Sequence, residues 1–240
     1  MLYKYIGSNN AEDVLNNLER FINNGTISAS KPSSFNDPSE FKVSIKTEGS
    51  LDILQKTYET SENPKISFEE WLVVKNKVSQ NVARDLRKEA MEILGVVCLS
   101  PVANSILMWS HYSESHKGFC IGFDDDFVNS VSDFHRFDAV RYIGAVPIFN
   151  HATEDIDALF QKLFFYKDSC WCYENEKRII TKSHGIKTFD KNYIKEVCLG
   201  HNVDPLVEKG ARQLAAHNPH IQFWKMTTIV DGYELIKTTI

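Results

Sequence analysis

Short segments rich in β-branched and aromatic residues are scattered along the 240-residue chain without regular alternation with helical segments. Such runs are typical of strands. Regular alternation would predict a parallel α/β sheet, whereas scattered strands favour an α+β fold. We predict strands at residues 2–6, 26–30, 96–100, 119–123, 140–143, 193–199, 222–229 and 233–238, and one starting at about residue 176.

Helical spacing of apolar residues dominates residues 51–94, with a break around Asn63-Pro64. Ser67 and Glu70 form a capping box at the start of the second half. We therefore predict a helical insertion at about residues 51–94, within a single domain that spans residues 1–240. Further helices are expected after Asn9 or Asn10 up to Gly25, and at residues 106–115 and 156–166.

Charge and cysteine content narrow the class of protein. The 27 Lys and Arg residues and 32 Asp and Glu residues give a net charge of -5, which provides no general attraction to phosphate backbones. No apolar run approaches the roughly 20 residues of a membrane span, and the N-terminus is not a secretory signal. Five cysteines without paired spacing suit a reducing compartment. We expect a cytoplasmic protein with no membrane association and no disulfides.

Several sequence signatures of known sites are missing. The eleven glycines form neither a GxGxxG nor a GxxxxGK pattern, which argues against Rossmann and P-loop nucleotide sites. Cys170-x-Cys172 and Cys198-x-x-His201 do not match zinc-ligand spacing, so no metal is expected. The run of acids at residues 124–126 is typical of a solvated turn or a helix N-terminus.

The segment at residues 171–178 concentrates two acids and a guanidinium. In a strand, Cys172, Glu174, Glu176 and Arg178 would share one face and place two carboxylates in one site. In a helix, Glu174 and Arg178 would form an ordinary surface pair worth a few tenths of a kcal/mol. The β-branched residues 179–181 favour a strand from about Glu176. A salt-bridged structural strand remains the alternative to a functional pair of acids.

A second dense block mixes aromatic residues with imidazoles at residues 108–118. On a helix, Trp109, His111 and Tyr112 would provide a wall for a flat ligand. An ordinary half-buried helix explains the same composition, because His and Tyr bury their rings while their polar atoms stay bonded. Both interpretations stay open here, as does the role of His116.

Three blocks carry a resemblance to a known family. They are Phe35-Asn36-Asp37-Pro38-Ser39-Glu40, the block Leu107-Met108-Trp109-Ser110-His111-Tyr112 that continues through His116-Lys117-Gly118-Phe119, and Trp171-x-Tyr173-Glu174-x-Glu176-x-Arg178. They resemble a widespread bacterial and phage-associated family catalogued as a domain of unknown function. The resemblance spans nearly the whole chain, from Leu2 to the C-terminal strands, and implies a shared fold without an assured activity.

The order of segments also resembles, more remotely, the layout of ADP-ribosyltransferases. An opening strand, a helix, Gly25 and a second strand are followed by a strand ending in Ser100 and a late Glu174-x-Glu176 strand. This resemblance implies a split β-sheet whose cleft binds NAD.

The second resemblance implies roles for individual residues. Lys4 or Tyr5 would stand at the first polar motif, where Arg or His is more usual, and Ser100 at the middle motif. Glu176 would be the catalytic acid and Glu174 its helper. A carboxylate facing the ribosyl cation stabilises the transition state more than the ground state.

The remaining residues implied for the NAD site are Arg178, which would keep the acids ionised or contact a phosphate, and Trp109, His111 and Tyr112, which would line the nicotinamide or adenine site. The leading hypothesis is an ADP-ribosyltransferase-like enzyme, acting as a toxin or phage-defence effector on NAD and an unknown protein, nucleic-acid or small-molecule acceptor.

Two alternatives belong to other classes. The chain is a non-catalytic binding module if Glu174, Glu176 and Arg178 form a structural network. It is a metal-dependent nuclease if Asp37, Glu40 and Glu176 hold a cation. The acceptor, the oligomeric state and the roles of Asn36 and Asp37 are left open by the sequence.

Overall fold

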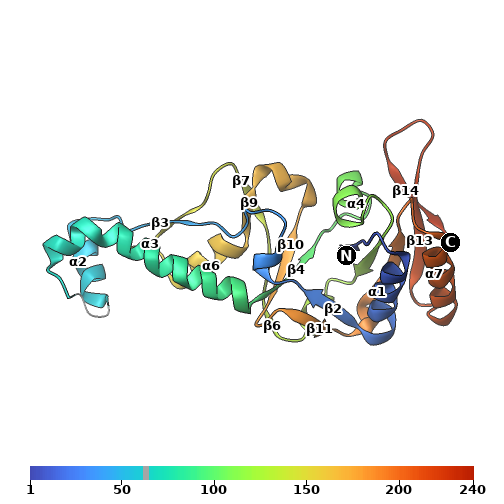
Figure 1. Ribbon diagram of the computed structural model, residues 1–240, viewed down its shortest axis with the longest axis horizontal. Helices are drawn as coiled ribbons and strands as arrows, with labels where there is room; N and C mark the ends of the chain where they lie inside the picture. The colour runs from blue at the N-terminus through green and yellow to red at the C-terminus, as the bar shows by residue number, and fades with distance from the viewer. Residues whose placement is uncertain (62–64) are drawn as a thin grey trace. The chain divides into compact units, whose positions relative to one another are not determined.

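A computed structural model of the protein describes residues 1–61 and 65–240 and divides the chain into two compact units (Figure 1). Unit 1 comprises Met1–Ser30, Gly95–Ala139 and Cys172–Ile240, and unit 2 comprises Lys31–Leu94 and Val140–Trp171. A compact unit is a geometric division, not an independently folding domain, so the expectation of a single domain stays a prediction. The mixed composition of helices and strands confirms the α+β prediction.

Unit 1 contains a five-stranded sheet in which neighbouring strands are far apart in sequence. Its order is β1 (Leu2–Ile6), β5 (Phe119–Phe123), β12 (Ile194–Leu199), β13 (Gln222–Thr228) and β14 (Leu235–Thr239). β12 and β13 are parallel, and the other pairs are antiparallel. All five strands were predicted within two residues of these bounds.

A second sheet of unit 1 carries the acidic segment. Its antiparallel order is β4 (Gly95–Leu99), β10 (Lys177–Thr181) and β6 (Phe134–Ala139), with β10 in the centre. β2 (Thr26–Ala29) pairs separately with β11 (Gly185–Thr188). β1 and β4 approach each other at a bridge in which Tyr3 N donates to Ser100 O at 2.7 Å and Ser100 N donates to Tyr3 O at 2.9 Å.

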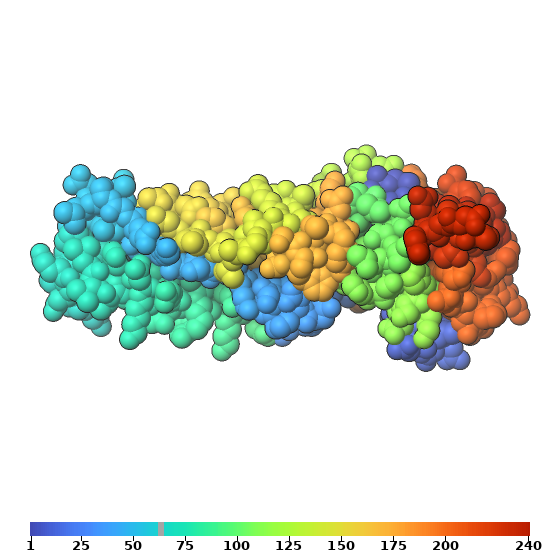
Figure 2. Space-filling view, turned by 90° about the horizontal axis from the view of Figure 1, so that it is seen from above, coloured from blue at the N-terminus to red at the C-terminus, as the bar shows by residue number. Residues whose placement is uncertain are grey.

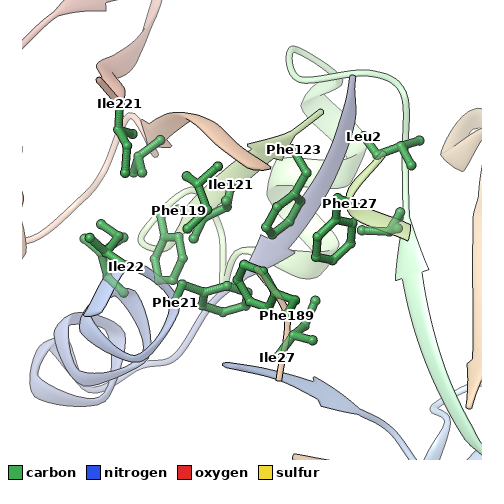
Figure 3. Close-up of a cluster of buried hydrophobic side chains, with 14 of the residues drawn as sticks. Leu2, Phe21, Ile22, Ile27, Phe119, Ile121, Phe123, Phe127, Phe189 and Ile221 are labelled. Carbon is green, nitrogen blue, oxygen red and sulfur yellow. The ribbon is translucent and has the colours of Figure 1, made fainter. Parts of the chain in front are cut away.

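An aromatic core joins α1 (Ala11–Asn24) to the five-stranded sheet (Figure 3). The Phe123 ring stacks on Phe127 with centroids 4.0 Å apart and meets Phe189 edge-on at 5.4 Å. Phe21 brings the apolar face of α1 edge-on to Phe119 at 6.2 Å. α5 (Phe127–Ser130), the 3-10 helix η3 (Lys191–Tyr193) and α7 (Pro205–His217) complete the helices around this core; α7 was not predicted.

α1 begins and ends as its sequence indicates. The Asn10 side chain accepts a hydrogen bond from Glu12 N, and Gly25 adopts the left-handed conformation with φ of 59°. Leu15 lies against Gly210 of α7, where an added Cβ would approach a Leu15 methyl to 2.4 Å.

α4 (Ile106–Tyr112) is shorter than the predicted helix at residues 106–115. Glu114, Ser115 and His116 have φ values of 49°, 54° and 68°, which the helical conformation does not allow. Gly118 then passes so close to β1 that an added Cβ would lie 1.9 Å from Ile6 O. The chain therefore turns out of the helix early to enter β5.

Unit 2 combines α2 (Leu51–Thr60), α3 (Phe68–Ile93) and α6 (Ile156–Phe164) with two short parallel pairs. The pairs are β3 (Ser44–Lys46) with β8 (Ile148–Asn150), and β7 (Arg141–Ile143) with β9 (Tyr166–Asp168). The 3-10 helix η1 (Pro32–Ser34) lies at the start of this unit. The Ser67–Glu70 capping box is present, while the predicted break at Asn63-Pro64 lies outside the described residues.

We predict that Gly118→Ala lowers the free energy of unfolding by about 3 kcal/mol or more, because the new methyl group meets backbone atoms that cannot move independently. Urea denaturation measures the change. Gly144→Ala is the matched control, since an added Cβ there meets nothing within 4 Å. Equal stabilities of the two variants would contradict the close approach of β1 and β5 at this position.

Candidate functional site

The two acids of the 171–178 segment do not lie on one continuous strand. Glu174 ends the 3-10 helix η2 (Ser169–Glu174), Asn175 has a φ of 47°, and β10 begins only at Lys177. The strand predicted from about Glu176 is confirmed, but the alternative of one extended face from Cys172 to Arg178 is not observed, because the left-handed residue redirects the chain between the acids. Cys172 is exposed, whereas Glu174 and Glu176 are buried.

Glu176 and Arg178 form a buried bidentate ion pair. Arg178 Nε donates to Glu176 Oε1 at 2.8 Å, and Nη2 donates to Oε2 at 2.9 Å. Glu176 is 5% exposed and Arg178, on the central strand of its sheet, is 0% exposed. Two parallel charge-assisted bonds fix the orientation of the carboxylate.

Glu174 is fixed by groups from two other elements. Its carboxylate Oε1 accepts a hydrogen bond from the Tyr112 hydroxyl of α4. Its backbone O accepts one from Ser100 Oγ at 2.7 Å. Burial raises the pKa of Tyr112 well above its usual range, and the hydrogen bond to Glu174 and the negative charges of Glu174 and Glu176 add to the effect. Tyr112 therefore lies within the electrostatic field of both acids.

Cys98 is a member of this cluster that the sequence did not reveal. It lies directly opposite Arg178 in the β4–β10 pairing. Burial and the neighbouring Glu176 raise the pKa of the Cys98 thiol, while the positive charges of Lys4 and Arg178 lower it. Lys4 of β1 thus acts electrostatically on the same thiol as Glu176 and Arg178. The sequence alone could not place Cys98 beside Arg178, because its sequence neighbours are ordinary apolar strand residues. Only the pairing of β4 with β10 brings the two residues together.

The more exposed part of the cluster is aromatic. His111 Nδ1 and the Tyr173 hydroxyl are 2.8 Å apart, and their rings meet edge-on with centroids at 5.8 Å. His111 is exposed, and Tyr173 and Tyr112 are partly exposed. These three side chains are thus available to a ligand, and the acids lie beneath them as a buried layer.

Two residues that were predicted to contact NAD lie in a buried cluster. Trp109 is fully buried, with Nε1 donating to Ala103 O at 2.8 Å, and the Tyr5 hydroxyl donates to Val102 O at 2.6 Å. Their rings meet edge-on at 5.3 Å. Trp109 and Tyr5 therefore position α4 against β1, and their predicted contact with NAD stays a prediction.

His116 packs against the same core. Its ring stacks on Trp109 at 6.3 Å, and its Nε2 lies 3.2 Å from Ser110 Oγ. Burial lowers the pKa of His116, with a smaller contribution from His201.

Glu196 of β12 is a second buried acid that the sequence did not reveal. It accepts hydrogen bonds from Tyr3 OH at 2.6 Å, Trp224 Nε1 at 2.9 Å and Lys237 Nζ. The Lys237 ammonium also lies 5.5 Å from the centre of the Tyr3 ring. This fully bonded carboxylate is suited to joining β1, β12, β13 and β14.

Asp37 and Glu40 are engaged within unit 2. Asp37 accepts from Ser39 N at 2.7 Å and from Trp171 Nε1 at 2.9 Å. Buried Glu40 pairs with Lys167 at 2.8 Å, and Lys167 lies over the Trp171 ring. Within residues 1–61 and 65–240, no group of three or more His, Cys, Asp or Glu side chains is arranged to hold a metal ion. Asp37 and Glu40 thus brace the 35–40 loop.

Residues 108–179 match the model of a family described as "Protein of unknown function (DUF2971)". The matched segment, less than a third of the chain, includes α4 from Met108 onward and both acids but not the 35–40 block. Comparisons with curated proteins and with solved structures found no match. The chain is therefore similar to a family of unknown function over this segment. The resemblance expected from Leu2 onward stays a prediction.

Among the helices of the described residues, none combines the length and apolarity needed to cross a membrane.

We predict that Arg178→Met lowers the free energy of unfolding by about 3–5 kcal/mol, because Glu176 is left as a buried charge without its bidentate partner. The double variant Glu176→Met with Arg178→Met should recover part of this loss. Arg212→Met is the control: its pair with Glu208 is exposed and contributes about 1 kcal/mol or less. Equal losses in Arg178→Met and Arg212→Met would refute the buried pair.

A second prediction concerns alkaline pH. Since the folded-state pKa of Tyr112 is raised, its contribution to stability is complete below the unfolded value of about 10 and declines as pH rises above it. Tyr112→Phe should therefore lose stability less steeply than wild type between pH 9 and 11. The difference is at most about 1 kcal/mol per pH unit, reduced by partial exposure. Tyr233→Phe, at a 94% exposed position, should follow wild type.

Proposed function

We propose that unit 1 is an ADP-ribosyltransferase-like enzyme that uses NAD as a substrate, with Glu176 stabilising the ribosyl cation. The observation that carries this proposal is the convergence of Glu176 and Arg178 with Glu174, Tyr112 and Lys4 where β1, β4, β10 and α4 meet. The split between the five-stranded and three-stranded sheets, with the Glu176–Arg178 pair near it, suits the layout expected from the resemblance.

The proposed role of Glu176 is electrostatic stabilisation of the transition state. Cleavage of the bond between nicotinamide and ribose leaves positive charge on the sugar, so an oriented carboxylate lowers the barrier more than it strengthens substrate binding. Arg178 supplies the orientation through its two bonds to Glu176. The pair needs no reorganisation when the cation forms, because both side chains are already fixed in a buried position.

The side chains around Glu176 and Arg178 have the remaining roles in binding NAD and the acceptor. Lys4 adds positive charge for the pyrophosphate, and His111, Tyr112 and Tyr173 provide the accessible aromatic surface for a flat ring. Glu174 orients the incoming nucleophile through its contact with Tyr112, and Ser100 holds the Glu174 backbone. The acceptor is a protein, a nucleic acid or a small molecule. The role of toxin or phage-defence effector rests on the sequence resemblance.

A non-catalytic binding module is the second candidate. The observation that favours it is the burial of Glu174, Glu176 and Arg178, which are 2%, 5% and 0% exposed. In that function, the three charges fix α4 and η2, and only His111 and its aromatic neighbours meet the partner. The two candidates differ in whether Glu176 affects any chemistry on NAD.

Nicotinamide release from NAD tests the leading proposal. We expect wild type to release nicotinamide, and Glu176→Gln to reduce the rate about 100-fold or more, because the neutral amide no longer opposes the cation. Thermal unfolding checks that the variant is folded. Glu208→Gln is the matched control, since Glu208 pairs with Arg212 and Lys225 elsewhere in unit 1.

Two results would overturn the proposal that the protein is an enzyme acting on NAD. The first is wild-type protein that neither releases nicotinamide nor shows an NAD-dependent rise in melting temperature with mixed acceptors. The second is Glu176→Gln protein that releases nicotinamide at the wild-type rate. The first result would leave the binding module as the function that the geometry supports.

A further inference from the structure

Unit 2 contains an apolar groove that no part of the proposed function uses. Its volume is about 600 Å³, within the range of small-molecule sites. Side chains of α2, α3, β8, α6 and neighbouring residues form its walls. The principal apolar residues are Ile45, Val78, Val82, Phe149, Ile156 and Leu159.

A smaller recess of about 170 Å³ continues the groove along α3 and α6. Ala83, Leu86, Ile156 and Leu159 line both hollows, so the two hollows adjoin each other. In Figure 2, the teal surface of α3 and the yellow surface of residues near 150 lie on the two sides of the blue segment that contains β3. The combined space is elongated and mainly apolar.

The groove leaves apolar side chains in water. Val78, Val82 and Leu86 follow one another at intervals of four residues along α3 and are 45%, 54% and 44% exposed. Ile156 at the start of α6 is 68% exposed. An apolar ligand would remove these side chains from water, a gain of about 25 cal/mol per Å² buried.

Arg87 supplies a charge at the smaller recess. Its side chain lines the recess with Phe160 and Phe164. Among the described residues it forms no ion pair: Nη2 donates a long bond of 3.5 Å to Glu40 O, and the buried Nε has no acceptor. A buried donor without an acceptor is costly, and an anion on Arg87 would remove that cost.

The other charges near the groove are compatible with an anion. Among the described Asp, Glu, Lys and Arg side chains that line the two hollows, Arg87 is the cation and Glu154 is the acid. Glu154 lines the larger hollow, but Lys162 pairs with it and lowers its pKa. The Glu154 charge is therefore compensated within the protein.

We propose that unit 2 binds a single-chain amphipathic carboxylate of the fatty-acid class. The apolar chain lies along the groove between α3 and α6, and the carboxylate accepts hydrogen bonds from Arg87. An elongated apolar space with one unpaired guanidinium matches a ligand that has one apolar chain and one anionic end. The proposal does not depend on NAD chemistry in unit 1.

Calorimetric titration of the full chain with dodecanoate, below its micelle concentration, tests the proposal. We expect saturable binding of one molecule per chain, weakened about tenfold or more in Arg87→Met, because a charge-assisted bond is lost. Arg84→Met is the matched control: Arg84 lies one turn away on α3, is 71% exposed and is paired with Asp85. Dodecanol, which lacks the charge, should bind wild type and Arg87→Met equally weakly.

A second variant tests the groove itself. Ala83→Phe places a ring where both hollows meet and should abolish dodecanoate binding, with circular dichroism and thermal unfolding confirming a folded chain. Equal dodecanoate affinity in wild type and Arg87→Met would overturn the proposal, as would binding that never saturates. Failure to bind dodecanoate, together with self-association that Val82→Asp abolishes, would also overturn it and assign the groove to a second copy of the chain.

Discussion

The bidentate pair between Glu176 and Arg178 sets the conditions for the rest of unit 1. A guanidinium at 0% exposure on the central strand of a sheet is tolerated only with a carboxylate beside it. Glu176 stands just before β10, so it can reach back to Arg178 with both oxygens. The pairing with β4 then brings Cys98 opposite Arg178 and draws Lys4 into the same electrostatic environment.

The strained segments of unit 1 serve this arrangement. Asn175, at a φ of 47°, separates η2 from β10 and turns Glu174 toward Tyr112 instead of along the strand. The left-handed run from Glu114 to His116 ends α4 and returns the chain to β5. Asn175 lies directly between the two acids, and backbone hydrogen bonds such as that from Gly118 N to Ser113 O hold the left-handed run. Unit 2 differs from unit 1 in that it contains an open apolar groove and an Arg87 side chain without an ion-pair partner among the described residues.

Most regular elements follow from local pattern. Apolar spacing placed α1 and α3, Asn10 and Ser67 marked their starts, and the runs of β-branched and aromatic residues placed β1, β4 and β5. β6 was not predicted because its Phe-His-Arg-Phe-Asp-Ala sequence is neither an apolar run nor a regular alternation, and its strand conformation depends on pairing with β10. The 3-10 helix before β10 was not predicted, because residues 171–178 have an alternating composition that a strand would also allow.

The sequence by itself determined that acids, a guanidinium, aromatics and imidazoles are concentrated at residues 108–118 and 171–178, since composition is a local property. It also determined the α+β class, which depends on local periodicity. Only the tertiary structure decided that Tyr112 meets Glu174, that Trp109 and Tyr5 are core residues, and that Cys98 lies beside the pair. Those contacts join positions distant in sequence, and their free energy comes from burial and strand pairing that no local window of residues contains.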